Sequence, residues 1–388
     1  MKVTAIETFV VPSEHWHPWV FCAVRTDEGI TGYSEFGEGG MAGPLVSLID
    51  AIAPIVIGRD PGPIARLCQD IFAANRYTTG GLQTMAIAGI ELALWDIKGK
   101  SLGVPVHRLW GGPFRDRQRV YWSHLGTFRA RWPGLYGTRP LKTWDDLADA
   151  AREVVNAGYT ALKTNILWPG DPSRLIDQQF VGPHDLNATG KLIDHTVNQI
   201  SVIRDAVGPD IDIALDINAN FRTDGAIRIA RVLEPFDLMW LEIDTRDPVA
   251  LAQIKSSTST PICSGEQLLG MRDYQPYFRL HAMDTVKVDV AWQGFINAKQ
   301  SAELAEIYEL NIAPHNPASH LATFQSAHLT ASVSNVRIME SDIDSPLWRD
   351  ELVSAVPEII DGHMTIPTSP GWGCDLNEEI ARKHALTG

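Results

Sequence analysis

Short apolar segments alternate with longer amphipathic segments from about residue 118 to residue 355. The short segments are rich in β-branched residues, as is typical of buried strands, and the longer ones place apolar residues at helical spacing. Eight strands alternating with helices predict an α/β fold, a parallel sheet closed into a (β/α)8 barrel. The predicted strands are 121–125, 160–165, 212–218, 238–244, 261–266, 285–290, 310–316 and 336–340, and the helices include 143–157, 189–207, 224–234, 247–256 and 295–310.

The first 118 residues follow a different pattern, in which three strands precede three helices. Thr26 to Gly29 form a polar turn between the second and third strands, with glycine where a hairpin favours positive φ. We predict an α+β unit at 1–118, the barrel at 119–355 and an irregular tail at 356–388 that returns to pack on the first unit. The predicted strands are 2–11, 19–25 and 30–36, and the helices are 45–57, 63–75 and 83–101.

Charged or strongly polar residues end seven of the predicted barrel strands. From Asp216 onward they recur at intervals of 23 to 26 residues, which fits one strand, loop and helix each. A single such residue is more often a helix cap or a solvated strand end. In a barrel, however, the C-terminal strand ends meet at one mouth, so the regular series predicts a site there. The series is Lys163, Asp216, Glu242, Glu266, Asp289, His315 and Glu340.

Two excursions interrupt this spacing. The interval from Lys163 to Asp216 is 53 residues, and its surplus, residues 168–190, is rich in Pro, Gly and Asp. Residues 126–142 form a similar excursion. Long segments of this composition are typical of loops, and we expect the first of them to lie over the mouth.

Three carboxylates on consecutive strands, Asp216, Glu242 and Glu266, suit a hard cation. Mg²⁺ takes oxygen ligands and keeps coordination positions for water or substrate. Without a cation, three converging carboxylates would repel one another and one would take up a proton. Zinc is disfavoured because the trio contains neither Cys nor His.

His315 and Asp289 lie on adjacent predicted strands. An Asp beside a His orients the ring and stabilises its protonated form, so the pair predicts a general base. Lys163 is expected on the opposite side of the mouth and Glu340 next to the pair. A structural histidine in a PHNP turn is the alternative for His315 alone.

Strand alternation adds a second group of polar residues, each two positions beyond a member of the series. We expect Asn165, Asn218 and Asp244 to bind substrate or to support the site, with a solvated loop start as the alternative. His15 and Trp16, in the loop of the first unit, are candidates for covering a polyhydroxy substrate, although packing is equally consistent with an aromatic residue there.

The net charge of −14 argues against nucleic acid as a partner, because phosphate binding needs a basic surface. The four cysteines include no C-x-x-C pair and do not indicate a disulfide framework. The N-terminus lacks the features of a signal peptide, and no apolar run is long enough to span a membrane. We therefore expect a cytoplasmic protein that acts on a small molecule.

The sequence resembles the enolase superfamily, in its mandelate racemase/muconate lactonizing branch, over essentially the whole chain. The resemblance is carried by RTDEGITGYSEFGEG, by IAGIELALWDIKGKSLGVPVHRLWGG, by the ordered strand-end residues and by PGWGCDLNE in the tail. It implies that the first unit and the tail form a capping domain over the barrel mouth, and that the protein is a homo-oligomer. It also implies Mg²⁺ ligands at Asp216, Glu242 and Glu266, a His315–Asp289 dyad, and a substrate-carboxylate contact at Glu340.

Three departures from the family pattern affect these expectations. The second barrel strand reads Lys163-Thr164-Asn165 where the racemase subgroup often has Lys-x-Lys, so Asn165 replaces a second base. The fourth strand ends Glu242-Ile243-Asp244 instead of Glu-Glu-Pro, which adds a carboxylate. The segment after His315 resembles that of acid-sugar dehydratases, with His320 where a small residue is common.

These features predict removal of the proton next to a substrate carboxylate. Mg²⁺, Lys163 and Glu340 would stabilise the enediolate, with Glu340 protonated or sharing a hydrogen. A racemase needs a base on each face, whereas His315 alone suits β-elimination, in which it could also protonate the leaving hydroxyl. We therefore predict a hydro-lyase that dehydrates a sugar acid to a 2-keto-3-deoxy acid. The alternatives are a racemase or epimerase with Lys163 as the second base, and a non-catalytic regulatory protein that binds metal or acid sugars.

Overall fold

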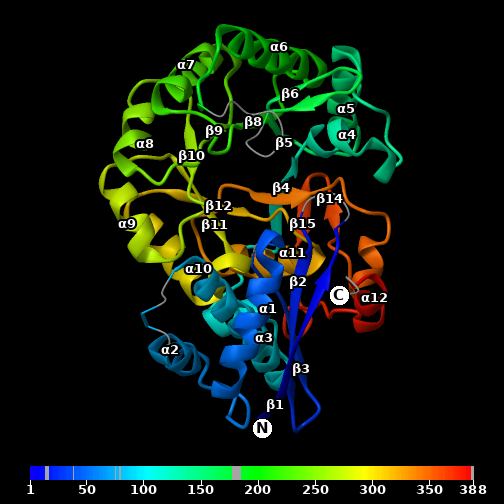
Figure 1. The fold of residues 1–388 in the computed structure, drawn as a ribbon, viewed down its shortest axis with the longest axis vertical. Helices are drawn as coiled ribbons and strands as arrows, with labels where there is room; N and C mark the ends of the chain where they lie inside the picture. Colours follow the sequence, from blue (N-terminus) through cyan, green and yellow to red (C-terminus); the bar gives the residue numbers. More distant parts are fainter. Residues whose placement is uncertain (14–16, 38, 75, 78–79, 177–184, 386–388) are drawn as a thin grey trace.

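The computed structural model describes the chain except for residues 14–16, 38, 75, 78–79, 177–184 and 386–388. Figure 1 shows two parts, a ring of strands and helices in the upper half and the blue N-terminal strands and helices in the lower half. Within the described residues, no helix combines the length and apolar character needed to cross a membrane.

The N-terminal part is an antiparallel sheet with helices packed on it. The strands pair in the order β1-β2-β3, and Gly29 has φ 80° in the turn between the last two, as predicted. Helix α3 also packs on the barrel helix α10, where Ile296 N donates to Glu91 Oε1 at 2.8 Å. The elements are β1 (Val3–Val11), β2 (Trp19–Thr26), β3 (Thr31–Glu35), α1 (Ala42–Ile52), α2 (Ile64–Ala74) and α3 (Gly81–Leu102).

Eight parallel strands form the barrel, and the predicted fold class is confirmed. Neighbouring strands follow the order β12-β11-β10-β9-β8-β5-β4-β13, and a parallel bridge from Ile312 to Val336 closes the ring. The strands are β4 (Arg117–Ser123), β5 (Ala161–Asn165), β8 (Asp212–Asp216), β9 (Trp240–Glu242), β10 (Ile262–Ser264), β11 (Thr285–Asp289), β12 (Asn311–His315) and β13 (Met339–Asp342).

Helices follow the strands around the ring. Thr143 and Asp146 form a reciprocal capping box at the start of α5. Helix α10 begins five residues before the predicted start at 295 and is interrupted at Gly294, which has φ 80°. The helices are α4 (Thr127–Arg131), α5 (Trp144–Asn156), α6 (Gly190–Val207), α7 (Thr223–Leu233), α8 (Pro248–Lys255), α9 (Met271–Arg279), α10 (Val290–Ile307) and α11 (His320–Ser332).

The long insertion after β5 contains a small antiparallel pair, β6 (Leu167–Trp168) and β7 (Arg174–Leu175). The ring of His195 on α6 stacks on Trp168 with centroids 4.4 Å apart, which holds the pair against the barrel. Leu175 lines the cavity at the barrel mouth, so this described part of the predicted loop lies there.

The tail, which we predicted to be irregular, forms a hairpin and a helix. Strands β14 (Ile359–Ile360) and β15 (His363–Thr365) extend the sheet because β15 pairs antiparallel with β4. This pairing also explains why β4 begins four residues before its predicted start at 121. Helix α12 (Glu378–His384) then packs on β1, and Arg25 of the neighbouring strand β2 donates to Glu378 at 2.9 Å. In Figure 1, the red C-terminal helix accordingly lies beside the blue strands.

Candidate active site

The C-terminal strand ends surround a cavity that residues of the N-terminal part also reach. Beneath it, the barrel interior is filled by small and aromatic side chains, among them Tyr121, Ala214 and Trp240. The cavity lies above this layer, as expected for a barrel enzyme. Its lining comprises His17, His124, Thr127, Phe128, Lys163, Asn165, Leu175, Asp216, Asn218, Glu266, Trp292, His315 and Pro317.

Two buried lysines lie among carboxylates at the cavity floor. Lys163 Nζ lies 3.3 Å from Asp216 Oδ2, 3.1 Å from Glu242 Oε1 and 2.9 Å from Glu340 Oε1. Burial alone lowers the pKa of Lys163, but the charges of Glu242 and Glu340 outweigh it and hold the pKa well above its ordinary value. Lys163 therefore keeps its proton and a positive charge.

Lys287, in the middle of β11, was not among the predicted site residues. Its Nζ donates to Tyr121 Oη at 2.7 Å and to Glu340 Oε2 at 2.8 Å, and its side chain is fully buried. Alternation along β11 places Lys287 on the same side of the strand as Asp289, which was the available signal.

The structure does not place Glu340 in the cavity wall. Its carboxylate is buried and accepts hydrogen bonds from Ser123, Lys287 and the backbone N–H of Asn316, besides its ion pair with Lys163. Burial raises its pKa, but the two lysines reverse that effect and hold the pKa well below its ordinary value. Two ammonium groups stabilise the charged form of Glu340 and so disfavour the protonated form, while the alternative of a shared hydrogen stays a prediction. In this arrangement Glu340 positions Lys163 and Asn316.

The predicted metal trio is divided between two partners. Asp216 and Glu242 face Lys163, whereas Glu266 Oε2 lies 3.2 Å from His315 Nε2. Within the described part of the chain, no three His, Cys, Asp or Glu side chains converge closely enough to form a metal site. The assignment of the trio as ligands therefore remains a proposal.

The charges around the trio nevertheless fit a cation. Burial raises the pKa of Glu266 well above its ordinary value, and the charges of Asp244, Glu242 and Asp216 raise it further. Asp244 is 8% exposed, and its Oδ1 has no hydrogen-bond partner among the described residues. Buried carboxylates that repel one another, one with an orphaned oxygen, form a hard oxygen donor set of the kind that binds Mg²⁺.

We expect the Asp244→Asn variant to be more stable than the parent chain when both are measured in EDTA. A buried carboxyl without a hydrogen-bond partner costs about 1–3 kcal/mol, and an amide carries no charge to bury. Chemical denaturation measures the difference, with Asp210→Asn, at an exposed site, as the control. If Asp244→Asn were equally or less stable than the parent chain, other groups of the protein would already stabilise the Asp244 carboxyl.

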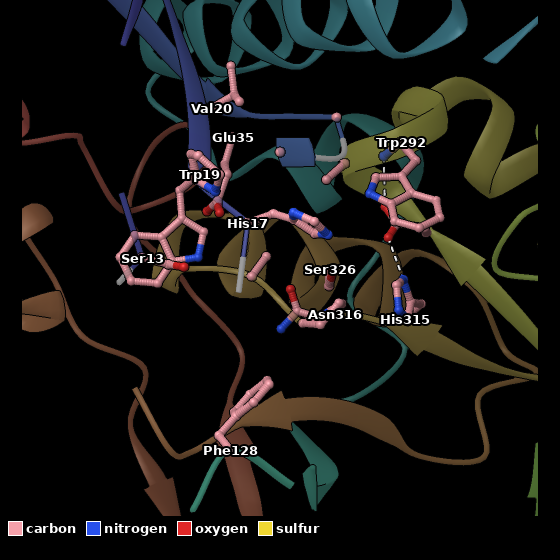
Figure 2. A pocket seen from close by; sticks show the side chains of 17 residues that line it. Ser13, His17, Trp19, Val20, Glu35, Phe128, Trp292, His315, Asn316 and Ser326 are labelled. Atoms are coloured by element: carbon pink, nitrogen blue, oxygen red, sulfur yellow. Dashed lines mark hydrogen bonds and ion pairs between the residues drawn. The ribbon is translucent and has the colours of Figure 1, made fainter. Parts of the chain in front are cut away.

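The predicted dyad is formed. His315 Nδ1 lies 2.7 Å from Asp289 Oδ2, while Asp289 Oδ1 accepts the backbone N–H of Trp292 at 2.7 Å and so caps α10. The indole of Trp292 packs edge-on against the imidazole, with centroids 5.1 Å apart. Figure 2 shows the His315 ring below Trp292, with the dashed bond to Asp289. Asp289 engages Nδ1 and Glu266 faces Nε2 at 3.2 Å, so Nε2 is the nitrogen left for a substrate if Glu266 binds a cation instead.

Two of the three second-layer residues line the cavity. Asn165 Oδ1 accepts a hydrogen bond from Thr127 Oγ1 at 2.9 Å, and its Nδ2 donates to Asn218 Oδ1 at 3.4 Å. Asp244 is not part of the lining. His320 lies outside this cavity. It pairs at 2.7 Å with Asp350, which belongs to the short 3-10 helix (Arg349–Leu352) after β13.

The N-terminal part closes the other side of the mouth. Ser13, His17 and Trp19 line an adjoining cavity that shares His315 and Trp292 with the first (Figure 2). Glu35 lies there too and accepts the backbone N–H groups of Ser319 at 2.8 Å and Ala322 at 3.0 Å, which fixes the loop after His315. The predicted contacts of His15 and Trp16 fall outside the described residues.

His124, Thr127, Phe128 and Trp292 are cavity residues that the sequence analysis missed. Thr127 and Phe128 belong to a segment predicted to be a loop, and their approach to the cavity depends on the short helix α4. His124 carried a usable signal, because it lies near the end of the first predicted strand, where the other barrel strands carry polar residues.

Two family models match the chain. Residues 5–111 match the model described as mandelate racemase / muconate lactonizing enzyme, N-terminal domain, and residues 146–380 match the model described as enolase C-terminal domain-like. Together they include the N-terminal unit and all predicted site residues of the barrel.

Curated relatives and solved structures resemble the chain over nearly its full length. D-xylonate dehydratase from Haloferax volcanii is 29% identical and is matched over 100% of this chain and 90% of its own length. D-galactonate dehydratase from Xanthomonas euvesicatoria is 30% identical, over 99% of this chain and 94% of its own. A Burkholderia xenovorans structure, provisionally described as an L-alanine-DL-glutamate epimerase and bound to magnesium and fumarate, is 36% identical with TM-score 0.95, over 99% of this chain and 96% of its own.

Proposed function

The chain belongs to the mandelate racemase / muconate lactonizing enzyme family of the enolase superfamily, and from this premise we propose that it is a Mg²⁺-dependent sugar-acid dehydratase. It removes the proton on C2 of a 2,3-dihydroxy acid and expels the C3 hydroxyl as water, which gives a 2-keto-3-deoxy acid. The curated relatives named above are hydro-lyases of this kind.

The observation that carries the proposal is that one cavity histidine, His315, is paired with an aspartate of the neighbouring strand, while strand β5 offers no second base. His315 presents Nε2 while Asp289 holds Nδ1. On strand β5, Lys163 lies against three carboxylate oxygens at 2.9–3.3 Å, which matches the three protons of an ammonium and leaves no lone pair for a base. Asn165, two residues on, has no basic group. A site without a base on β5 to oppose His315 suits elimination better than inversion at C2.

The residues divide the reaction among them. Asp216, Glu242 and Glu266 would hold Mg²⁺, which when bound withdraws negative charge from the substrate carboxylate. His315 Nε2 takes the C2 proton, and Asp289 stabilises the imidazolium that results. Lys163 contributes a fixed positive charge beside the enediolate. Removal of the C2 proton gives the enediolate, whose electron pair then forms the C2–C3 double bond as the C3–O bond breaks. The departing oxygen takes a proton from an acid of the cavity and leaves as water, and the enol that remains takes a proton at C3 to become the ketone.

A second candidate is epimerisation at C2. It is favoured by the similarity to the Burkholderia xenovorans structure, which is described provisionally as an epimerase. It requires a base on the face opposite His315, and the three ion contacts of Lys163 argue against that residue. A non-catalytic regulatory protein is the least supported, because neither a formed dyad nor buried repelling carboxylates are needed for binding alone.

A panel of aldonic and aldaric acids tests the proposal. D-xylonate and D-galactonate come first, with Mg²⁺ present, and a carbonyl reagent detects 2-keto product. We expect 2-keto product from at least one acid. No product should form from the same acids with excess EDTA or from the corresponding 3-deoxy acids.

We expect Mg²⁺ to stabilise the wild-type chain against unfolding. An ion at 100 times its Kd adds about 2.7 kcal/mol to the free energy of unfolding. The Glu266→Gln variant should lose most of this gain, whereas Glu351→Gln, at an exposed site, should keep it. Thermal unfolding with Mg²⁺ or EDTA measures both. An undiminished gain in Glu266→Gln would contradict the ligand assignment.

A further inference from the structure

His124 lies at the cavity in an unusual backbone conformation. It follows the last residue of β4 and has φ 60°, a left-handed value that is uncommon for residues other than glycine. Its side chain lines the cavity together with Lys163 and His315 and is 14% exposed. The ring packs against Phe128 with centroids 4.8 Å apart. Strained backbone that aims a side chain into a cavity is often found at functional positions.

His124 forms a second histidine–aspartate pair at the same mouth. Its Nδ1 lies 3.5 Å from Asp342 Oδ1 and 3.3 Å from Ser123 Oγ. Asp342, at the end of β13, is 4% exposed, and its Oδ1 has no hydrogen bond among the described residues. Nδ1 of His124 therefore lies next to a buried carboxylate oxygen.

The proposed elimination needs an acid as well as a base. Hydroxide is a poor leaving group, and general acids act within hydrogen-bond reach of the departing oxygen. Of the cavity residues, Lys163 is engaged by three carboxylates, Glu266 belongs to the proposed ligand set, and amides and hydroxyls are too weak as acids. The imidazoles of His17 and His124 remain, and His124 combines a left-handed backbone at the end of β4 with a buried aspartate beside its ring.

We propose that His124 is the catalytic acid that protonates the departing C3 hydroxyl, an inference that rests on the proposed dehydratase function. As the C3–O bond breaks, its electron pair remains on oxygen, which takes the Nε2 proton of His124 and leaves as water. His124 becomes neutral and regains a proton from solvent. Base and acid are then separate residues, so His315 need not return the proton it has taken.

The His124→Asn variant separates the two half-steps. After His315 removes the C2 proton, the enediolate either takes a proton back or loses the hydroxyl. In D₂O, the variant should still place deuterium at C2 of recovered substrate, while the ratio of dehydration to exchange falls by about 10²–10⁴-fold. The assay uses the panel acid that the wild type dehydrates and follows both reactions by NMR.

A fluorine leaving group gives an independent readout. The 3-deoxy-3-fluoro analogue of the same acid expels fluoride, which needs less protonation than hydroxide. His124→Asn should therefore eliminate fluoride at a rate within about tenfold of the wild type. With fluoride as the leaving group, the reaction no longer needs the general acid, which otherwise raises the rate about 10²–10⁴-fold. Asp342→Asn should lower the dehydration-to-exchange ratio in the same direction and serves as the second variant if His124→Asn does not fold.

The outcomes are distinguishable. The proposal would be overturned if the rates of exchange and dehydration fell together in both His124→Asn and Asp342→Asn, or if the fluoro analogue did not restore elimination. His124 would then position the substrate instead of donating a proton. The proposal would also be overturned if His17→Asn, and not His124→Asn, lowered the ratio. Failure of the proposed function itself would be seen earlier, as a wild-type chain that forms no 2-keto product from any panel acid.

Discussion

Replacing His315 by asparagine should lower the dehydration rate by about 10²–10⁴-fold while the protein remains folded. The asparagine amide can still donate to Asp289, which His315 Nδ1 contacts at 2.7 Å, so the cap of α10 on Trp292 is preserved. What is lost is Nε2, the only basic atom assigned to the C2 proton. Deuterium exchange at C2 should fall by the same factor as dehydration.

The parallel loss distinguishes His315 from His124. His281→Asn, at an exposed site away from the cavity, is the matched control and should keep full activity. Steady-state kinetics should show the loss in kcat with a smaller change in KM, because His315 acts on the transition state. Retained exchange in the His315→Asn variant would assign proton removal to another residue.

The Lys287→Met variant should lose about 3–5 kcal/mol of unfolding free energy, because it leaves a buried charge without one of its partners. Methionine has a similar volume but cannot donate to Glu340 Oε2 or Tyr121 Oη, which Lys287 Nζ contacts at 2.8 and 2.7 Å. The remaining ammonium, Lys163, would then have to compensate Asp216, Glu242 and Glu340 alone.

A double variant and a surface variant make this test specific. Adding Glu340→Gln to Lys287→Met should recover part of the loss, with a coupling of about 0.5–3 kcal/mol. Lys142→Met removes an exposed ion pair, with Asp171, and should cost about 1 kcal/mol or less. Denaturant unfolding in EDTA measures the parent chain, these three variants and the Glu340→Gln single variant, which the coupling requires. A similar small loss of stability in Lys287→Met and Lys142→Met would show that the charged side chains at the cavity floor are in contact with water.

The barrel was predictable because each of its strands is short, apolar and ends at a polar residue. The spacing from Asp216 to Glu340 follows directly from one strand, loop and helix per repeat, and the dyad follows from adjacent strands. Strand β4 was harder to delimit, because its first residues pair with β15, a contact that spans more than 240 residues of sequence.

The charges of the site could be predicted only in part, because ionisation depends on partners distant in sequence. Glu340 was expected to be protonated or to share a hydrogen, but Lys287 supplies a second buried cation. Alternation along β11 indicated the side on which Lys287 lies but not its contact with Glu340. Asp244 was recognised as an extra carboxylate, yet its orphaned Oδ1 is visible only once the neighbouring loops are in place.

His124 shows the same limit at the level of a single residue. Its strand was predicted, but its left-handed backbone and its proximity to Asp342 arise from the pairing of β4 with β13 at the closure of the ring. Pairing between the first and last strands of a barrel is a tertiary property, which local patterns do not specify.

The central claim, that one base removes the C2 proton and water then leaves, is tested most directly in D₂O with Mg²⁺ and the acid panel. NMR of the complete mixture should show a 2-keto-3-deoxy acid accumulating, and any substrate recovered early should carry deuterium at C2 with its original configuration. Formation of the C2 epimer without loss of water would contradict the account, because it requires a second base opposite His315.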